Sequence, residues 1–302
     1  MPWRTNCASE RRKTAPSGNP RALPPPRRAA DSPSMARGNA ARPVAGNLVR
    51  EVFLTLPGLN LDPARLDPLR SILHSSGAAT LAPALAGYAK TGPQELVSAR
   101  QWMGDLTEAH QEARFLHPGA AISMLGFSIG AALGLVWCQM TGNAFDRVVL
   151  VAPALGLRPL TRLGLLALSS LPSSWMIPSA GPRDYQWHRA TSVNHYRAAQ
   201  YLMVRIASGP GPRPRASFTA VSPKDELISP EAARLYVQAC HDAGPAGAHK
   251  LHWIEHRPRF GWPRHLTLDA TTLGETHWNS LRSALLDWLA ATAPEKSFPP
   301  LS

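Results

Sequence analysis

The segment with the clearest chemical potential is Gly126-Phe127-Ser128-Ile129-Gly130. An apolar run over residues 120–125 precedes it, and small and apolar residues suited to a helix follow over 131–136. This order predicts a strand, a tight turn and a helix, with Ser128 at the apex of the turn. The two glycines of the motif let the strand and the helix approach closely. A hydroxyl held beside the first N–H groups of a helix is typical of a nucleophile. The motif alone also arises by chance, so its meaning depends on the rest of the chain.

A serine nucleophile needs a base that takes its proton and an acid that orients the base. Asp225 is the candidate acid, because it follows the apolar run 217–221 directly and lies in a loop. A short carboxylate at the end of a strand can reach a histidine from the next loop. The structural alternative for Asp225 is a helix cap or an exposed turn residue.

The candidate base lies between the last expected strand, 250–254, and the last expected helix, 278–291. His265 precedes the helix and has apolar neighbours that could fix its backbone, so it is the preferred base. His277, at the expected start of the helix, is the alternative base. Most of the other histidines are explained better as surface or core groups.

The donors of an oxyanion hole are expected to be two backbone N–H groups. One is that of Ile129, directly after the nucleophile, and the other that of Leu59, in the loop after the first strand. Gly58 lets this loop approach closely. Neither role depends on the identity of a side chain.

The elements that must position these groups alternate along the chain. Expected strands are 52–56, 79–85, 120–125, 147–153, 217–221 and 250–254. Expected helices are 66–74, 93–116, 131–142, 231–243 and 278–291. Alternating apolar strands and helices predict an α/β fold, with a mostly parallel central sheet covered by helices on both faces.

Residues 155–205 interrupt this alternation. The segment is too long for a simple crossover, and we interpret it as a mostly helical lid insertion over the carboxyl ends of the strands. Its leucines could instead pack on the sheet as core. We therefore expect one domain over residues 48–302 that contains this insertion.

The net charge of the 302 residues is +12, and residues 1–50 carry ten Lys/Arg and two Asp/Glu. The basic character is therefore mainly a property of the amino-terminal segment. Residues 1–47 contain Pro, Arg, Ala and Ser with almost no large apolar residue, which predicts a disordered tail. It is either a solvated extension, which we favour, or an arm that touches nucleic acid or an anionic membrane. No nucleic acid partner is expected for the folded domain.

Three widely spaced cysteines, Cys7, Cys138 and Cys240, show no metal-ligand spacing and predict free thiols in a reducing, cytoplasmic compartment. No apolar run reaches the length of a membrane-spanning helix. No metal and no organic cofactor is expected.

These residues resemble the α/β-hydrolase superfamily, in the esterase-like and lipase-like part, over about 49–291. The matching segments are the Ser128 motif, Pro57-Gly58-Leu59, the acid turn 223–230, and His265 or His277. One departure is Pro57, where the family often has histidine. The resemblance implies a nucleophile elbow and a Ser-His-Asp triad.

The combined expectation is a serine hydrolase that cleaves carboxylic esters through an acyl-enzyme, with Ser128, His265 and Asp225 as its triad. The apolar segment 163–175 suggests that the substrate is a small ester with an apolar acyl part. The alternative is a non-catalytic protein of the same fold that binds an apolar ligand.

Overall fold

A computed structural model describes residues 49–88, 97–209, 213–245, 247–256 and 262–294 of the chain. The expected disordered tail over residues 1–47 lies outside the described residues. Everything below concerns the unit that begins at Leu48.

Six strands form one parallel sheet in the order β2-β1-β3-β4-β7-β8. Their bounds are β1 Glu51–Leu56, β2 Ala79–Leu81, β3 Ala121–Phe127, β4 Arg147–Val151, β7 Ala216–Val221 and β8 His249–Trp253. Every residue of β1, β4 and β7 is buried. Burial on both faces explains why β4 is apolar at every position after Arg147 and does not alternate.

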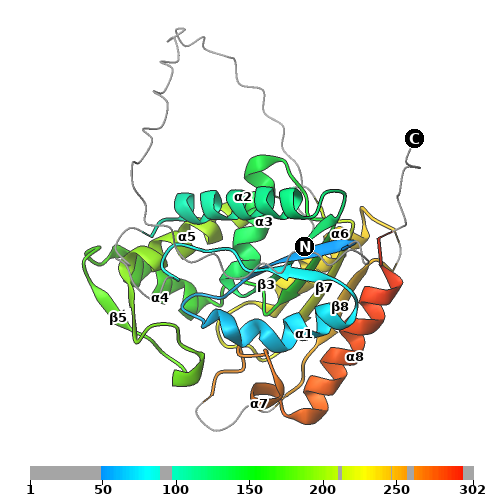
Figure 1. Cartoon of the computed structure of the whole chain (residues 1–302). Coiled ribbons are helices and arrows are strands. Elements are labelled where there is room, and N and C mark those ends of the chain that lie inside the picture. The colour runs from blue at the N-terminus through cyan, green and yellow to red at the C-terminus, as the bar shows by residue number, and fades with distance from the viewer. Residues whose placement is uncertain (1–48, 89–96, 210–212, 246, 257–261, 295–302) are drawn as a thin grey trace, which may run out of the picture. The chain divides into compact units, whose positions relative to one another are not determined.

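α-Helices between and after the strands cover both faces of the sheet. Their bounds are α1 Asp67–Ser75, α2 Ala99–Leu116, α3 Ile129–Thr141, α6 Pro230–His241, α7 Ala270–Leu273 and α8 Glu275–Ala291. Figure 1 shows α1 and α8 on one face of the sheet, and α2 and α3 on the other. The α/β class expected from the sequence is therefore confirmed. Several boundaries differ from expectation, since β2 ends at Leu81 and not at residue 85, α2 begins at Ala99 and not at residue 93, and α8 begins at Glu275 and not at residue 278. The short helix α7 was not foreseen.

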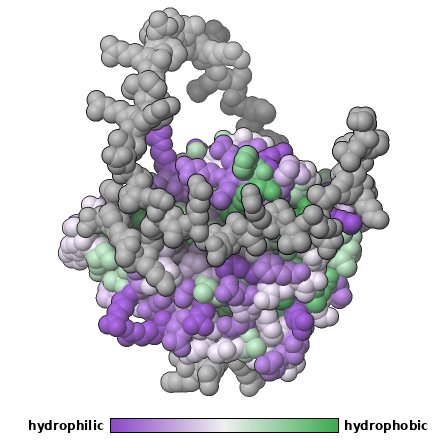
Figure 2. All heavy atoms as spheres, viewed as in Figure 1, coloured by the Kyte–Doolittle hydropathy of each residue, from purple (hydrophilic) through white to green (hydrophobic). Residues whose placement is uncertain are grey.

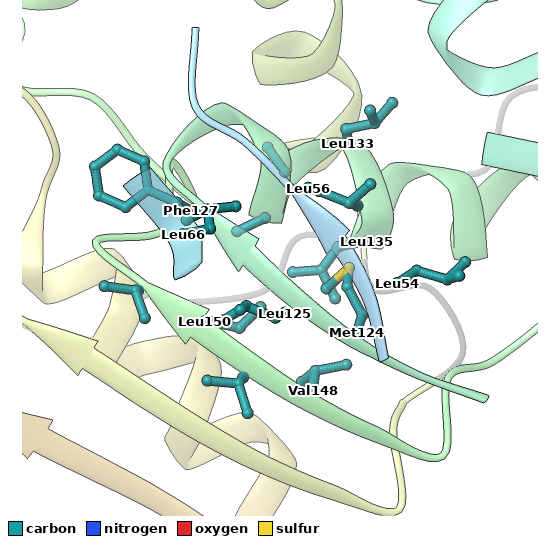
Figure 3. Close-up of a cluster of buried hydrophobic side chains, with 14 of the residues drawn as sticks. Leu54, Leu56, Leu66, Met124, Leu125, Phe127, Leu133, Leu135, Val148 and Leu150 are labelled. Carbon is teal, nitrogen blue, oxygen red and sulfur yellow. The ribbon is translucent and has the colours of Figure 1, made fainter. Parts of the chain in front are cut away.

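The core lies between the central strands and α3. Figure 3 shows Leu54 and Leu56 of β1 and Met124 of β3 in one cluster with Leu133 and Leu135 of α3. All five side chains are buried. Since this packing fixes α3 on β1 and β3, it also fixes the turn that joins β3 to α3.

Polar groups anchor the amino ends of three central strands. Glu51 of β1 and Arg147 of β4 form a buried ion pair, with the Arg147 Nε 2.8 Å from a Glu51 carboxylate oxygen. Ser123 of β3 donates its hydroxyl to the same carboxylate at 2.5 Å. Arg147 Nη1 also donates to the Leu289 carbonyl at 2.8 Å and to the Thr292 hydroxyl at 3.0 Å. These contacts tie the end of α8 to the sheet.

The segment between β4 and β7 holds η3 Arg183–Tyr185 and two helices, α4 Pro159–Ser170 and α5 Val193–Ile206. It also forms a small antiparallel sheet from β5 Met176–Pro178 and β6 Ala190–Ser192. α5 packs against α2 and α3, and α4 packs against α5. The expected insertion is thus partly a hairpin and partly two helices, one of which packs on α2 and α3, and its action as a lid stays a prediction.

The surface view in Figure 2 shows a largely hydrophilic face with separate small hydrophobic patches. In the described part of the chain, no helix combines the length and the apolar character needed to cross a membrane.

Candidate active site

The topology of the sheet creates a crevice between the carboxyl ends of β1 and β3. β1 is followed by α1 and β2, on one side of it in the sheet, whereas β3 is followed by α3 and β4, on the other side. Loops that leave adjacent parallel strands in opposite directions leave a space between them, where ligands bind in open α/β sheets. Leu56 and Gly126 are neighbours at this point of the ladder, so the loops that begin with Pro57 and Ser128 flank the crevice.

Ser128 stands at the apex of the turn between β3 and α3. Its backbone has φ 52° and ψ −118°, outside the regions that L-residues favour. Its N–H donates to the Val151 carbonyl at 3.0 Å, and its carbonyl accepts from the N–H groups of Ala131 and Ala154 at 3.1 Å each. These bonds to β4 and α3 hold the strained conformation in place.

The two glycines of the motif have no room for a side chain. A Cβ on Gly126 would lie 2.6 Å from the Cα of Ala131. A Cβ on Gly130 would lie 2.4 Å from the Leu56 carbonyl oxygen and 2.5 Å from that of Pro57. The close approach that the sequence predicts for both positions is therefore present.

Backbone strain gathers around the crevice. In the described part of the chain, the non-glycine residues with positive φ are Asn60, Ser128 and Ala152. They follow β1, β3 and β4 respectively, at the same edge of the sheet. Such conformations cost about 1–3 kcal/mol each and are typical of functional sites.

The side chains of Ser128, His265 and Asp225 meet at this edge. The Nε2 atom of His265 lies 2.7 Å from the Ser128 Oγ, and its Nδ1 lies 2.8 Å from the Asp225 Oδ2. The ring of Phe127 packs against the imidazole with its centroid 5.3 Å away. With Nδ1–H donating to the carboxylate, Nε2 is left as an acceptor that faces the serine hydroxyl.

Asp225 is fully buried in the turn after β7. Its Oδ1 accepts the N–H groups of Leu227 at 2.9 Å and Ile228 at 3.0 Å. Burial alone would raise the pKa of this carboxyl, but the hydrogen bond and charge of His265 and the two N–H donors outweigh burial and lower it. The carboxylate is therefore ionised at neutral pH and can stabilise a positive imidazole.

Sequence reasoning missed a second carboxylate in the same turn. Glu226 accepts the N–H of Arg264 at 3.1 Å, directly before the catalytic candidate His265. The N–H of Leu266 donates to the Pro263 carbonyl at 3.2 Å, so the histidine lies within a tight turn. The only sequence signal was that Glu226 follows the candidate acid, which does not reveal what it contacts.

A backbone donor set lies beside the serine. The N–H groups of Leu59 and Ile129 have no acceptor among the described residues, and both residues line the cavity at Ser128. Ile129 is the first residue of α3, where the helix dipole adds partial positive charge. The Ser128 N–H, in contrast, is bonded to β4. Sequence reasoning also missed a contact to the loop that carries Leu59, since the Tyr88 hydroxyl donates to the Gly58 carbonyl.

The alternative base, His277, lies in the first turn of α8. Within the described residues it neither lines the cavity at Ser128 nor hydrogen-bonds the serine. The structure thus brings His265, and not His277, to the serine. His277 is the third residue of α8, so the helix fixes its position away from the serine.

A cavity of about 300 Å³ opens at Ser128. Its apolar wall comes from the loops after the strands and from the segment between β4 and β7, and includes Leu59, Leu157, Leu165, Met203, Leu227 and Leu266. Its polar wall includes Asn60, Ser179, Gln186, Thr191 and Tyr196. A space of this volume with a mostly apolar lining suits a small organic ligand.

The leucines of α4 lie in two different environments. Leu165 lines the cavity, whereas Leu160 and Leu163 are 83% and 65% exposed. The N-terminal end of α4 is fixed to the turn that carries Asp225, since Arg158 donates its Nε to the Asp225 carbonyl and its N–H to the Leu227 carbonyl. Of the two expectations for these leucines, neither cover of the site nor packing as core therefore holds for all of them.

No cluster of three or more metal-ligating side chains occurs within the described ranges. The functional groups that meet at Ser128 are its hydroxyl, the imidazole of His265 and the carboxylate of Asp225.

Several solved structures share the fold. A metagenome-derived lipolytic enzyme of the LipS and LipT pair aligns with TM-score 0.60 and 17% identity, over 80% of this chain and 94% of its own. The monoglyceride lipase of Saccharomyces cerevisiae, bound to a substrate analogue, aligns with TM-score 0.62 and 13% identity, over 82% and 88%. Est1E of Butyrivibrio proteoclasticus with ferulic acid bound aligns with TM-score 0.56 and 16% identity, over 82% and 90%.

No curated protein matches the chain. The family model described as "Serine aminopeptidase, S33" matches residues 48–208, which is more than half of the sequence and includes the turn at Ser128. Together with the parallel sheet and its helices, this match shows that the chain belongs to the serine aminopeptidase S33 family of the α/β-hydrolase superfamily.

Proposed function

We propose that the protein is a serine hydrolase that cleaves carboxylic esters with an apolar acyl group. The observation that carries the proposal is the hydrogen-bonded series from the Ser128 hydroxyl through His265 to Asp225, at the wall of an apolar cavity. A nucleophile, a base and an orienting acid in this geometry are the requirements for acyl transfer.

In the proposed mechanism, His265 Nε2 takes the proton of Ser128 as Oγ attacks the ester carbonyl. The tetrahedral oxyanion accepts the N–H groups of Leu59 and Ile129, and Asp225 stabilises the imidazolium. His265 then gives the proton to the leaving alkoxide as the C–O bond breaks, which leaves an acyl-serine. Water, deprotonated by the same imidazole, hydrolyses the acyl-serine and regenerates the hydroxyl.

The lining of the cavity favours a neutral ester over an amino-terminal peptide. Among the described residues that line it, none is Asp, Glu, Lys or Arg. A peptide amino terminus would bring a charged ammonium into this space without a carboxylate partner, which is costly. The similar structures described as lipases and esterases also support ester cleavage. The apolar wall suits an acyl chain, while the polar wall suits the alkoxy side of the ester.

The test uses a fluorophosphonate probe and a p-nitrophenyl butyrate assay on the full chain. The wild-type protein should be labelled at Ser128 and should turn over the ester, and Ser128→Ala should lose both. Absence of labelling in the folded wild-type protein would refute the proposal. If labelling and turnover are absent while butyrate esters still bind equally to wild type and Ser128→Ala, the protein is a non-catalytic binder of apolar ligands.

A further inference from the structure

The peptide group that joins Gly58 and Leu59 is held from its carbonyl side. The Gly58 carbonyl accepts the hydroxyl of Tyr88 and the N–H of Leu61, the latter at 3.1 Å. The N–H of Leu59 belongs to this same peptide group. Because a peptide group is planar and, throughout the described residues, trans, its carbonyl and its N–H point in opposite directions. Fixing the carbonyl of Gly58 therefore fixes the direction of the Leu59 N–H.

The far end of the loop is held separately by Asn60, whose side chain bonds the backbone of His188 and whose carbonyl accepts the N–H of Trp187. Residues 57–60 contain no regular structure, and Asn60 adopts φ 54° directly after Leu59. A Cβ on Gly58 would lie 2.7 Å from the Phe127 ring, so the loop is pressed against the strand that carries the serine. Within the described residues, the hydrogen bonds of the Gly58–Leu59 peptide group itself are the two bonds to its carbonyl. Tyr88 supplies one of the two bonds, from a segment 30 residues away in sequence.

The chemistry of the pair sets the direction of the hydrogen bond. A carbonyl oxygen only accepts, so the phenol must donate. Burial raises the pKa of Tyr88 far above its usual value, against a smaller opposing effect of the Asn60 N–H, so the phenol keeps its proton at every pH suited to an assay. A hydrogen bond accepted at the carbonyl also polarises the peptide group and strengthens its N–H as a donor.

We propose that Tyr88 is a positioning residue for the oxyanion hole, which aims the N–H of Leu59 at the negative charge that develops during acyl transfer. This inference rests on the proposed function, because it matters only if an oxyanion forms at Ser128. Tyr88 is absent from the residues that line the cavity, so it acts through the Gly58–Leu59 peptide group and not by touching the substrate.

The expected effect of Tyr88→Phe is confined to the chemical step. Removal of a whole oxyanion donor lowers kcat by about 10²–10³-fold. Loss of one of two anchors leaves the donor present but less well aimed, and we expect kcat to fall about 10-fold to 50-fold, with KM changed less than twofold. The aim of the N–H affects the tetrahedral state much more than the planar ester.

The experiment compares wild type, Tyr88→Phe and Tyr236→Phe in the full chain. Tyr236 of α6 is also a half-buried tyrosine, but it does not line the cavity, so its variant controls for the loss of a tyrosine hydroxyl as such. Kinetics with p-nitrophenyl butyrate give kcat and KM. An alkyl trifluoromethyl ketone, which adds serine to form an anionic tetrahedral adduct, should bind Tyr88→Phe more weakly by the factor lost in kcat/KM. The matching uncharged methyl ketone should keep its affinity within twofold.

A second variant separates positioning from folding. Replacement of Tyr88 by 4-aminophenylalanine restores a donor at the same atom and should recover most of kcat. Equal kcat in wild type and Tyr88→Phe, or an equal loss of affinity for both ketones, would overturn the inference while the proposed function stands. A wild-type protein that neither reacts with the fluorophosphonate nor turns over the ester would overturn the proposed function and the inference with it.

Discussion

Replacing Asp225 with asparagine keeps the shape of the side chain and removes its charge. The structure determines which way the new amide must face. The position of Oδ1 accepts two N–H groups, from Leu227 and Ile228, so an NH₂ group there would oppose two donors. The amide oxygen therefore takes that position, and the NH₂ group faces His265 Nδ1, 2.8 Å away in the wild-type protein.

This orientation forces the wrong tautomer of the imidazole. Since an NH₂ group only donates, Nδ1 must become the acceptor, and the proton moves to Nε2. The Nε2–H then donates to Ser128 Oγ and cannot take its proton. In a serine protease the same change lowers kcat about 10⁴-fold, and we expect a loss of this order, which corresponds to about 5 kcal/mol in the barrier.

The assay is the kcat for p-nitrophenyl butyrate, with thermal unfolding followed by circular dichroism. Asp225→Asn should keep its melting temperature within a few degrees, because all its backbone bonds are retained. The matched control is Asp184→Asn, which removes an exposed carboxylate from the segment between β4 and β7 and should keep full activity. A folded Asp225→Asn variant within tenfold of the wild-type kcat would refute the tautomer argument.

Two other predictions concern the elbow and acid stability. Gly130→Ala should lower the free energy of unfolding by about 1–3 kcal/mol and should also lower kcat, because its Cβ would lie 2.4 Å from the Leu56 carbonyl oxygen and 2.5 Å from that of Pro57. The control is Gly164→Ala, on a helix with open space around it. In urea titrations this control should be neutral or slightly stabilising. Burial, with a smaller contribution from a neighbouring histidine, lowers the pKa of His195 from 6.5 to about 4, so the unfolded chain binds a proton between these values that the folded chain does not. Protonation of His195 in the unfolded chain therefore lowers the free energy of unfolding as the pH falls from 6.5 toward 4. The loss is about 2.5 kcal/mol at pH 4.5 and is nearly absent above pH 6.5. Urea unfolding at pH 7 and pH 4.5 gives the free energy of unfolding at each pH, and it should fall less between them in His195→Gln than in wild type. An equal fall in both proteins would contradict the lowered pKa of His195.

The strands were predictable from the sequence because most of them are buried on both faces. A residue run such as 147–151 is apolar in all but its first position, and Arg147 itself is buried through its pair with Glu51. The elbow was predictable as well, since its demand for small residues on both sides of Ser128 is local. Local steric demands and burial restrict the residue types directly, so both can be recognised in the sequence.

The remaining features depend on contacts between distant segments. The short hairpin of β5 and β6 lies in a stretch rich in proline and glycine, with no alternation to reveal it. His265 was the preferred base from the sequence, but His277 stayed open as an alternative, because both histidines precede apolar residues and the start of α8 was not fixed. The contacts of Tyr88 and Glu226 join segments 30 and 38 residues apart, and neither side chain differs in type from an ordinary surface residue.

The ion pair of Glu51 and Arg147 sits at the opposite edge of the sheet from Ser128. β1 and β4 start with a member of this polar group, β3 carries one as its third residue, and all three strands lead into loops at the edge that holds Ser128. Six residues of strand correspond to about 20 Å, which exceeds the roughly 7–10 Å beyond which the effects of two substitutions usually add. Libraries aimed at thermal robustness can therefore be confined to the amino-terminal edge, and libraries aimed at substrate preference to the carboxyl-terminal edge, with little interference between the two.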